Sequence, residues 1–122
     1  MKIERELMRG AGPTAVLKLL ERGEMYGYEL VEAISTKTDG VLAMGQSTLY
    51  PLLYNLEAKG LLKGVWREAM SGRERKYYRL TAKGKTRLAK EEAQWRAVVR
   101  AMNGLGVTAS LGVTASLGGQ PA

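Results

Sequence analysis

The fold of this chain is decided by residues 45–60, GQSTLYPLLYNLEAKG. At the 100° step of an α-helix, four leucines fall on one side at the spacing of a helix seated on a core: Leu49, Leu52, Leu53 and Leu56. The opposite side, which we call the exposed stripe, carries Ser47, Pro51, Tyr54 and Ala58, with Tyr50 and Asn55 on its flanks. The pattern therefore predicts a short helix with one buried and one exposed side.

The exposed stripe is a candidate surface for entering a nucleic-acid groove, because its side chains are small or carry hydroxyl and amide groups. We expect the helix to begin near Gln46 or Ser47, which places Pro51 in or near the first turn, and to end at Gly60. The alternative interpretation is that Tyr50 and Tyr54 are half-buried packing residues.

Two helices are predicted before this stretch. The first covers residues 3–22, and Pro13 predicts a bend or a fresh start within it. The second covers residues 26–37, where Gly27 allows close contact with a neighbouring helix. A turn at Asp39-Gly40 leads to the third helix, so the order is that of a helix-turn-helix.

A β-hairpin is predicted after the third helix. Residues 61–69 and 75–80 are rich in β-formers and flank a polar tip at Ser71-Gly72. The phase of the second strand favours Tyr78 as an inward residue, and Trp66 is expected to anchor the hairpin to the core. The fold class is therefore mainly α with a small β-hairpin, a winged helix-turn-helix in which this hairpin is the wing.

Positive charge is concentrated in the second half of the chain. The net charge is +7, and residues 61–122 carry twelve Lys/Arg against four Asp/Glu. Between residues 63 and 90 there are ten cations and two anions, and Arg73, Arg75 and Lys76 surround the hairpin tip. There they can approach phosphates or enter a minor groove. The alternative is an ordinary solvated charged face, which the adjacent helix-turn-helix makes less favoured.

A fourth helix is predicted from Thr81, as its cap, to about Asn103. It carries an apolar stripe that we expect to form a dimer interface with a second copy: Leu88, Trp95, Val98, Val99 and Met102. The alternative is that this helix folds back on its own domain.

Composition excludes several function classes. The chain has no cysteine and no histidine, which removes disulfides, the usual zinc sites and the commonest general base. No pair of carboxylates stands out, so we expect no catalysis, metal or cofactor. Charged residues interrupt the N-terminal segment, and no apolar run is long enough for a membrane span, so we expect a cytoplasmic protein with no membrane partner.

The C-terminal segment repeats GVTASL at residues 106–111 and 112–117. Two short copies made of small residues cannot bury a core, so the pattern predicts a flexible tail. We therefore expect a winged-helix domain over 1–80, a dimerisation helix over 81–104 and a tail over 105–122.

Three motifs together resemble the PadR family of bacterial transcriptional regulators. They are Tyr26-Gly27-Tyr28-Glu29-Leu30, then Ser47-Thr48-Leu49-Tyr50-Pro51 with Leu56-Glu57 and Gly60-Leu61-Leu62, and finally Ser71-Gly72 followed by Arg75-Lys76-Tyr77-Tyr78-Arg79-Leu80-Thr81. The resemblance covers roughly residues 5–103 and is closest to the short branch of the family, which has a single C-terminal helix.

The resemblance implies a homodimer that binds double-stranded operator DNA, usually as a repressor. It places the third helix in the major groove, where the matching positions are Ser47, Thr48, Tyr50, Pro51 and Tyr54. We count Gln46, at the start of this helix, among the DNA-binding candidates as well. The wing role falls to Arg73, Arg75 and Lys76. Some family members bind planar small molecules between dimer helices, so Trp95 is a candidate for stacking on such an effector. The alternative function is a winged-helix interaction module that binds RNA or an acidic protein partner.

Overall fold

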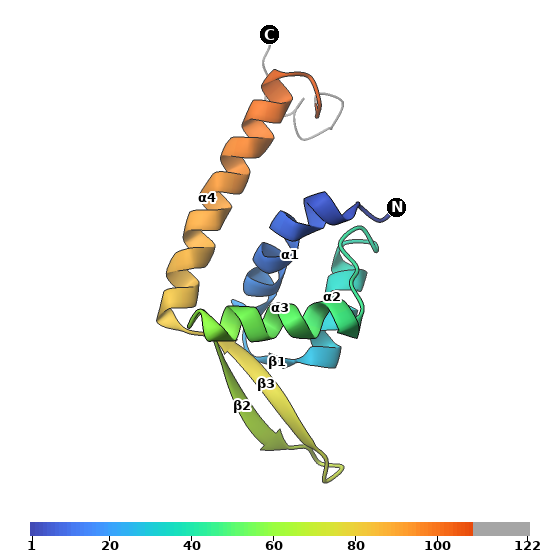
Figure 1. The fold of residues 1–122 in the computed structure, drawn as a ribbon, viewed down its shortest axis with the longest axis vertical. Coiled ribbons are helices and arrows are strands. Elements are labelled where there is room, and N and C mark those ends of the chain that lie inside the picture. The colour runs from blue at the N-terminus through green and yellow to red at the C-terminus, as the bar shows by residue number, and fades with distance from the viewer. Residues whose placement is uncertain (109–122) are drawn as a thin grey trace. The chain divides into compact units, whose positions relative to one another are not determined.

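The computed structural model describes residues 1–108, which form four helices and three strands. The elements are α1 (Arg5–Leu20), β1 (Met25–Tyr26), α2 (Gly27–Lys37), α3 (Gln46–Ala58), β2 (Leu62–Glu68), β3 (Glu74–Leu80) and α4 (Ala82–Gly104). The chain divides into two compact units after Leu88, so the first unit includes the start of α4. The predicted mainly α winged helix is confirmed (Figure 1).

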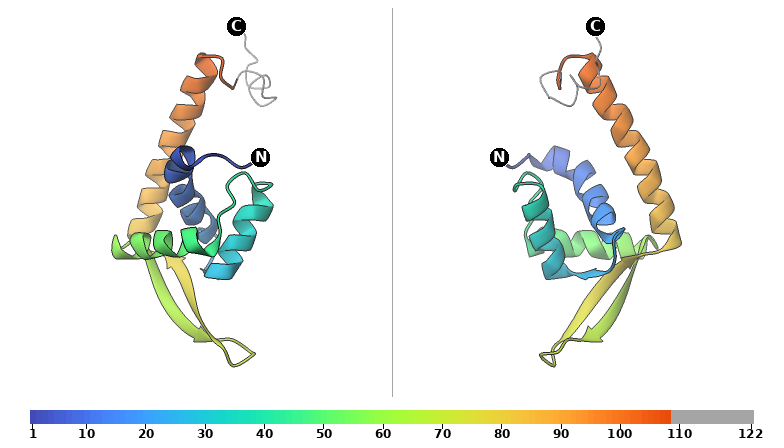
Figure 2. Two further views of the ribbon diagram at one scale, coloured as in Figure 1. Left: turned by 45° about the vertical axis from the view of Figure 1, so that its right-hand side comes forward. Right: turned by 180° about the vertical axis from the view of Figure 1, so that it is seen from behind.

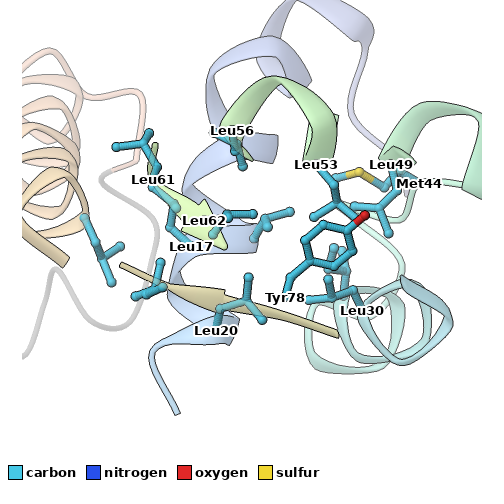
Figure 3. Packing of buried hydrophobic residues seen from close by; sticks show 14 residues of the cluster. Leu17, Leu20, Leu30, Met44, Leu49, Leu53, Leu56, Leu61, Leu62 and Tyr78 are labelled. Atoms are coloured by element: carbon cyan, nitrogen blue, oxygen red, sulfur yellow. The ribbon is translucent and has the colours of Figure 1, made fainter. Parts of the chain in front are cut away.

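The first unit is held by one apolar core. Every helix of the helix-turn-helix contributes leucines to it, and β3 contributes Tyr78, which is only 2% exposed, as its strand phase predicts. Figure 3 shows the Tyr78 ring lying among the leucines of α3. The helix α1 runs through Pro13 as a single element, so that residue does not start a new helix.

The sheet has three antiparallel strands in the order β1-β3-β2. In the long pair, Leu62 lies opposite Leu80, Gly64 opposite Tyr78 and Trp66 opposite Lys76. Two views in Figure 2 show β2 and β3 extending together away from α1, α2 and α3. The two-residue strand β1 pairs with β3 at Tyr77 and Tyr78, and sequence reasoning missed it because two residues carry no periodic signal.

Trp66 does not anchor the wing to the core, contrary to the prediction. Its side chain is 63% exposed, because the register places it toward the hairpin tip, beyond the buried pair Leu62–Leu80. The core anchor of the wing is Tyr78 instead.

The start of α4 is held within the first unit by contacts with residues 60 and 61. The backbone N–H of Gly84 donates to Thr81 Oγ1 at 2.9 Å, which confirms Thr81 as the cap, and the Thr81 hydroxyl donates to the Gly60 carbonyl at 2.7 Å. A Cβ atom on Gly84 would lie 2.1 Å from the Leu61 carbonyl oxygen, so only glycine permits this approach.

The prediction that Leu88 belongs to the dimer stripe is wrong. It is 1% exposed and belongs to the core of its own unit, because the close approach at Gly84 brings the next turn of α4 onto that core. It is therefore unavailable to a partner.

The predicted tail lies outside the described residues from 109 onward. Within residues 1–108, no helix combines the length and the apolar run that crossing a bilayer requires.

Gly84→Ala is expected to lower the free energy of unfolding by about 1–3 kcal/mol, because the added methyl group must displace backbone. Gly10→Ala is the matched control inside α1: its Cβ meets nothing within 4 Å, so it should raise stability by roughly 0.5–1 kcal/mol. Urea denaturation of both variants at one protein concentration measures the difference. Equal effects would contradict the close approach at Gly84.

The buried hydroxyl of Tyr78 makes the free energy of unfolding depend on pH. Burial raises the pKa of its hydroxyl, and the nearby Lys76 ammonium opposes part of that rise. The folded chain therefore keeps this proton where the unfolded chain has begun to lose it, so stability is retained below about pH 10 and falls above it. The native chain should lose stability relative to Tyr78→Phe as the pH rises above about 10. Denaturant titrations at several pH values test this, and parallel profiles would contradict it.

Candidate nucleic-acid interface

The exposed stripe of α3 lies on the surface, as the helical wheel predicts. Leu49, Leu53 and Leu56 are buried, and this fixes the rotation of the helix. The residues that consequently face outward are Gln46, Ser47, Thr48, Pro51, Tyr54, Asn55 and Ala58. Tyr54 is 57% exposed, so the packing interpretation does not apply to it.

Tyr50 has a different position from the rest of the predicted set. Its side chain is half-buried, and a Cβ atom on Gly27 would lie 2.4 Å from its ring atom Cε1. The ring therefore fills the space that the missing side chain of Gly27 leaves between α2 and α3. For Tyr50 the packing interpretation describes the structure, and the residue sets the spacing of the two helices.

The three predicted wing cations lie in three different environments. Arg73 is exposed at the hairpin tip. Arg75 stacks on the ring of Tyr26, with its guanidinium carbon 4.4 Å from the ring centroid. The Lys76 ammonium points toward α3 and contacts Glu57 Oε1 at 2.9 Å. Of the three, Arg73 has the environment best suited to an incoming phosphate.

Lys76 connects the wing to α3. Its ammonium lies 5.4 Å from the ring centroid of Tyr54 and 5.2 Å from that of Tyr78. The hydrogen bond to Glu57 raises the pKa of Lys76, while partial burial opposes this. The lysine therefore remains charged at neutral pH, and its charge is balanced within the protein.

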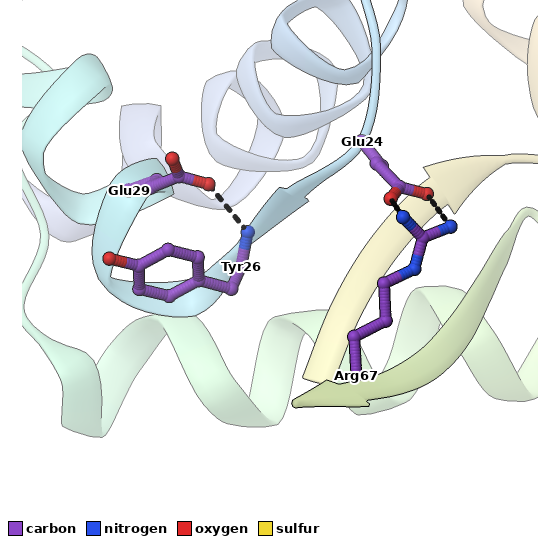
Figure 4. Close-up of polar contacts among 4 residues, drawn as sticks. All are labelled: Glu24, Tyr26, Glu29 and Arg67. Atoms are coloured by element: carbon purple, nitrogen blue, oxygen red, sulfur yellow. Dashed lines mark hydrogen bonds and ion pairs between the residues drawn. The ribbon is translucent and has the colours of Figure 1, made fainter. Parts of the chain in front are cut away.

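A second charged contact holds the other face of the wing, and sequence reasoning missed it. The Arg67 guanidinium forms two contacts with the Glu24 carboxylate, at 2.5 and 3.1 Å (Figure 4). It also lies 5.7 Å from the Tyr77 ring centroid. Tyr77 in turn packs edge-on against Tyr26, with 5.3 Å between centroids. Since half of the Arg67 side chain is exposed, this pair contributes about 0.2–1 kcal/mol at most.

The turn from β1 into α2 is fixed by a local hydrogen bond. The backbone N–H of Tyr26 donates to the Glu29 carboxylate at 3.1 Å, as Figure 4 shows. This contact satisfies a backbone donor at the start of α2, and it holds the Tyr26 backbone at the point where its ring meets Arg75.

An open groove of about 660 Å³ lies between α3, the wing and the β1–α2 turn. Its lining is rich in aromatic side chains and cations: Tyr26, Tyr28, Tyr50, Tyr54, Trp66, Tyr78, Arg73, Arg75 and Lys76, together with Gly27, Gln46 and Glu74. Phenol hydroxyls, an indole and guanidinium groups suit the sugars and phosphates of a nucleic-acid strand. All of these residues belong to the first unit.

The second unit carries the remainder of the predicted dimer stripe. The stripe recurs at the helical spacing i, i+3, i+4, i+7, and its members are 38–51% exposed: Trp95, Val98, Val99 and Met102. Among the described residues, no group of three or more Asp and Glu side chains could hold a metal ion.

Comparison with known proteins shows the family. Residues 16–90 match the Transcriptional regulator PadR-like family. Transcriptional regulator Rv3488 of Mycobacterium tuberculosis (strain ATCC 25618 / H37Rv) is 32% identical over 100 residues, which cover 82% of this chain and 90% of that protein.

Solved structures agree with this match. A transcriptional regulator from Clostridium thermocellum superposes with a TM-score of 0.75 at 32% identity, covering 83% of this chain and 95% of that one. A PadR family transcriptional regulator from Eggerthella lenta has a TM-score of 0.71 at 39% identity and covers 82% and 85%. The chain therefore belongs to the PadR-like family of transcriptional regulators, whose members are regulators and not enzymes.

Proposed function

We propose that this protein binds duplex DNA sequence-specifically as a homodimer and represses transcription from its operator. One observation carries the proposal: α3, through Gln46 and Tyr54, and the cationic wing, through Arg73, line one groove within the first unit. The major groove of DNA is about 12 Å wide and admits a helix. With α3 in that groove, the DNA backbone at the groove edge would pass between α3 and the wing. Family membership supports the same function.

In this proposal the two surfaces have separate tasks. Exposed, uncharged side chains of α3, with Gln46 and Tyr54 foremost, contact base edges. Arg73 contacts phosphate or the minor groove beside it, which positions the protein without selecting sequence.

The homodimer of the proposal forms through α4. The apolar side chains Trp95, Val98, Val99 and Met102 give a stripe that a second copy could cover isologously. A two-fold axis would require a pseudo-palindromic operator with half-sites about one helical turn apart. Repression would then follow from occupation of the operator in the cytoplasm.

Effector release is a further part of the proposal. The Trp95 indole lies in the stripe where two copies would meet, so a planar small molecule could stack on it. Fluorescence titration of a Trp66→Phe chain with planar ligands measures this through Trp95. Absence of saturable quenching across a diverse panel would leave Trp95 as a packing residue.

Selection from a random duplex pool at about physiological salt, followed by sequencing, tests the proposed function directly, because non-specific phosphate binding is weakened there. Enrichment of an inverted repeat is the expected result. A featureless pool would favour the alternative, an interaction module for RNA or an acidic protein.

Gln46→Ala is expected to weaken binding to the selected duplex by about 1–3 kcal/mol and to change random-DNA binding little, because it removes a base contact. Arg73→Ala should weaken both and lower the salt slope by about one, because it removes a phosphate contact. Fluorescence anisotropy at several salt concentrations measures both effects. Arg9→Ala is the charge-matched control, because Arg9 lies on α1, which contributes no residue to the groove. Equal loss on both duplexes for Gln46→Ala would count against base reading.

Val98→Glu is expected to convert the dimer to monomer and to reduce operator affinity at least about 100-fold, since an interface core does not accept an unpaired charge. Ala97→Glu is the control, because the neighbouring position projects from the opposite side of α4 and is exposed. Sedimentation equilibrium of both variants gives the oligomeric state. A Val98→Glu chain that remains dimeric would remove this stripe from the interface.

A further inference from the structure

The Lys76 side chain crosses the wing over a glycine. Gly64 lies opposite Tyr78 in the strand register, so Lys76 is its diagonal neighbour on the same face of the hairpin. A Cβ atom on Gly64 would lie 2.2 Å from Lys76 Cε and 3.0 Å from Glu57 Oε2. The absence of a side chain at residue 64 is therefore what lets the Lys76–Glu57 pair form between the wing and α3.

The surroundings of this pair oppose a swing of Lys76 toward solvent. The two side chains are only 22% and 31% exposed, and the ammonium lies near the Tyr54 and Tyr78 rings. If the lysine left to bind a phosphate, the Glu57 carboxylate would remain uncompensated beside the DNA. Removing one member of a partly buried pair costs more than the pair contributes to stability.

The pair also joins the two surfaces that the DNA would contact. Glu57 lies in the last turn of α3, three residues after Tyr54 of the exposed stripe, and Lys76 lies three residues after Arg73 on the wing. Because helix and wing must fit their grooves at the same time, the angle between them limits which duplexes can be bound tightly.

We propose that Lys76, seated over Gly64 and paired with Glu57, is a positioning residue that sets the angle of the wing on α3, and that it is not a phosphate contact. This inference rests on the proposed DNA-binding function. It separates Lys76 from Arg73, although both lie in the same cationic segment. It also assigns Gly64 a role in DNA binding without any contact to DNA.

A double-mutant cycle tests the role of Gly64. Gly64→Ala should weaken binding to the selected duplex about 10-fold in the native chain, because the methyl group expels Lys76. In the Lys76→Ala background the same substitution should change affinity less than about 2-fold, since only the end of the Glu57 side chain, no longer paired with Lys76, then lies near the methyl group. Equal losses in both backgrounds would overturn the inference. Thermal melting by circular dichroism shows which variants are folded. If Gly64→Ala alone does not fold, the double variant, which lacks the clash with Lys76, still tests the inference.

Salt dependence separates positioning from phosphate binding. Lys76→Ala should reduce affinity with the salt slope unchanged, whereas Arg73→Ala should lower the slope by about one. If Lys76→Ala lowers the slope as much as Arg73→Ala does, Lys76 binds phosphate and the inference is wrong.

A measurement without DNA keeps the inference separate from the proposed function. The chain has no cysteine, so spin labels can be attached at Ala58→Cys on α3 and Ser71→Cys at the wing tip. The distance distribution between them should broaden or shift on Glu57→Gln and on Gly64→Ala, and stay unchanged on Arg73→Ala. Unchanged distances in all three would overturn the positioning role. A native chain that selects no duplex would instead contradict the proposed function, whatever the labels report.

Discussion

The arrangement of this domain depends on the contact between the Tyr50 ring and the backbone of Gly27. The ring occupies the place of the missing side chain, and so α2 and α3 approach more closely than two ordinary helical residues would allow. Because the leucines of α3 pack into the core at the same time, both the distance and the rotation of α3 are fixed. The exposed stripe faces outward as a consequence of these two constraints.

A glycine whose Cβ position is occupied by another group is also found at two further contacts between elements. Gly64 accommodates the Lys76–Glu57 pair between wing and α3, and Gly84 accommodates the Leu61 carbonyl at the start of α4. At each point a glycine is needed because another group occupies the position of its Cβ atom, not because of an unusual backbone angle. Three close approaches of this kind leave little freedom between the helices and the wing.

Much of the fold could be predicted from the sequence because its signals are periodic or local. The leucine spacing identified α3 and its buried side, Gly60 marked its end, and Thr81 marked the start of α4. The strand β1 was missed because its pairing with β3 is tertiary, and Trp66 was misplaced because composition does not show how far α3 covers the hairpin. Similarly, Leu88 fits the apolar stripe of α4, but only the approach at Gly84 decides that it faces its own core.

The candidate site was less predictable, because positive charge along a sequence does not show where each charge points. Of the cations in the wing, Arg67 pairs with Glu24, Arg75 stacks on Tyr26 and Lys76 pairs with Glu57. These three hold the wing in place before any ligand arrives. A local excess of lysine and arginine therefore overstates the number of phosphates that a winged helix can neutralise, since part of that charge orients the wing through aromatic rings and carboxylates of the protein itself.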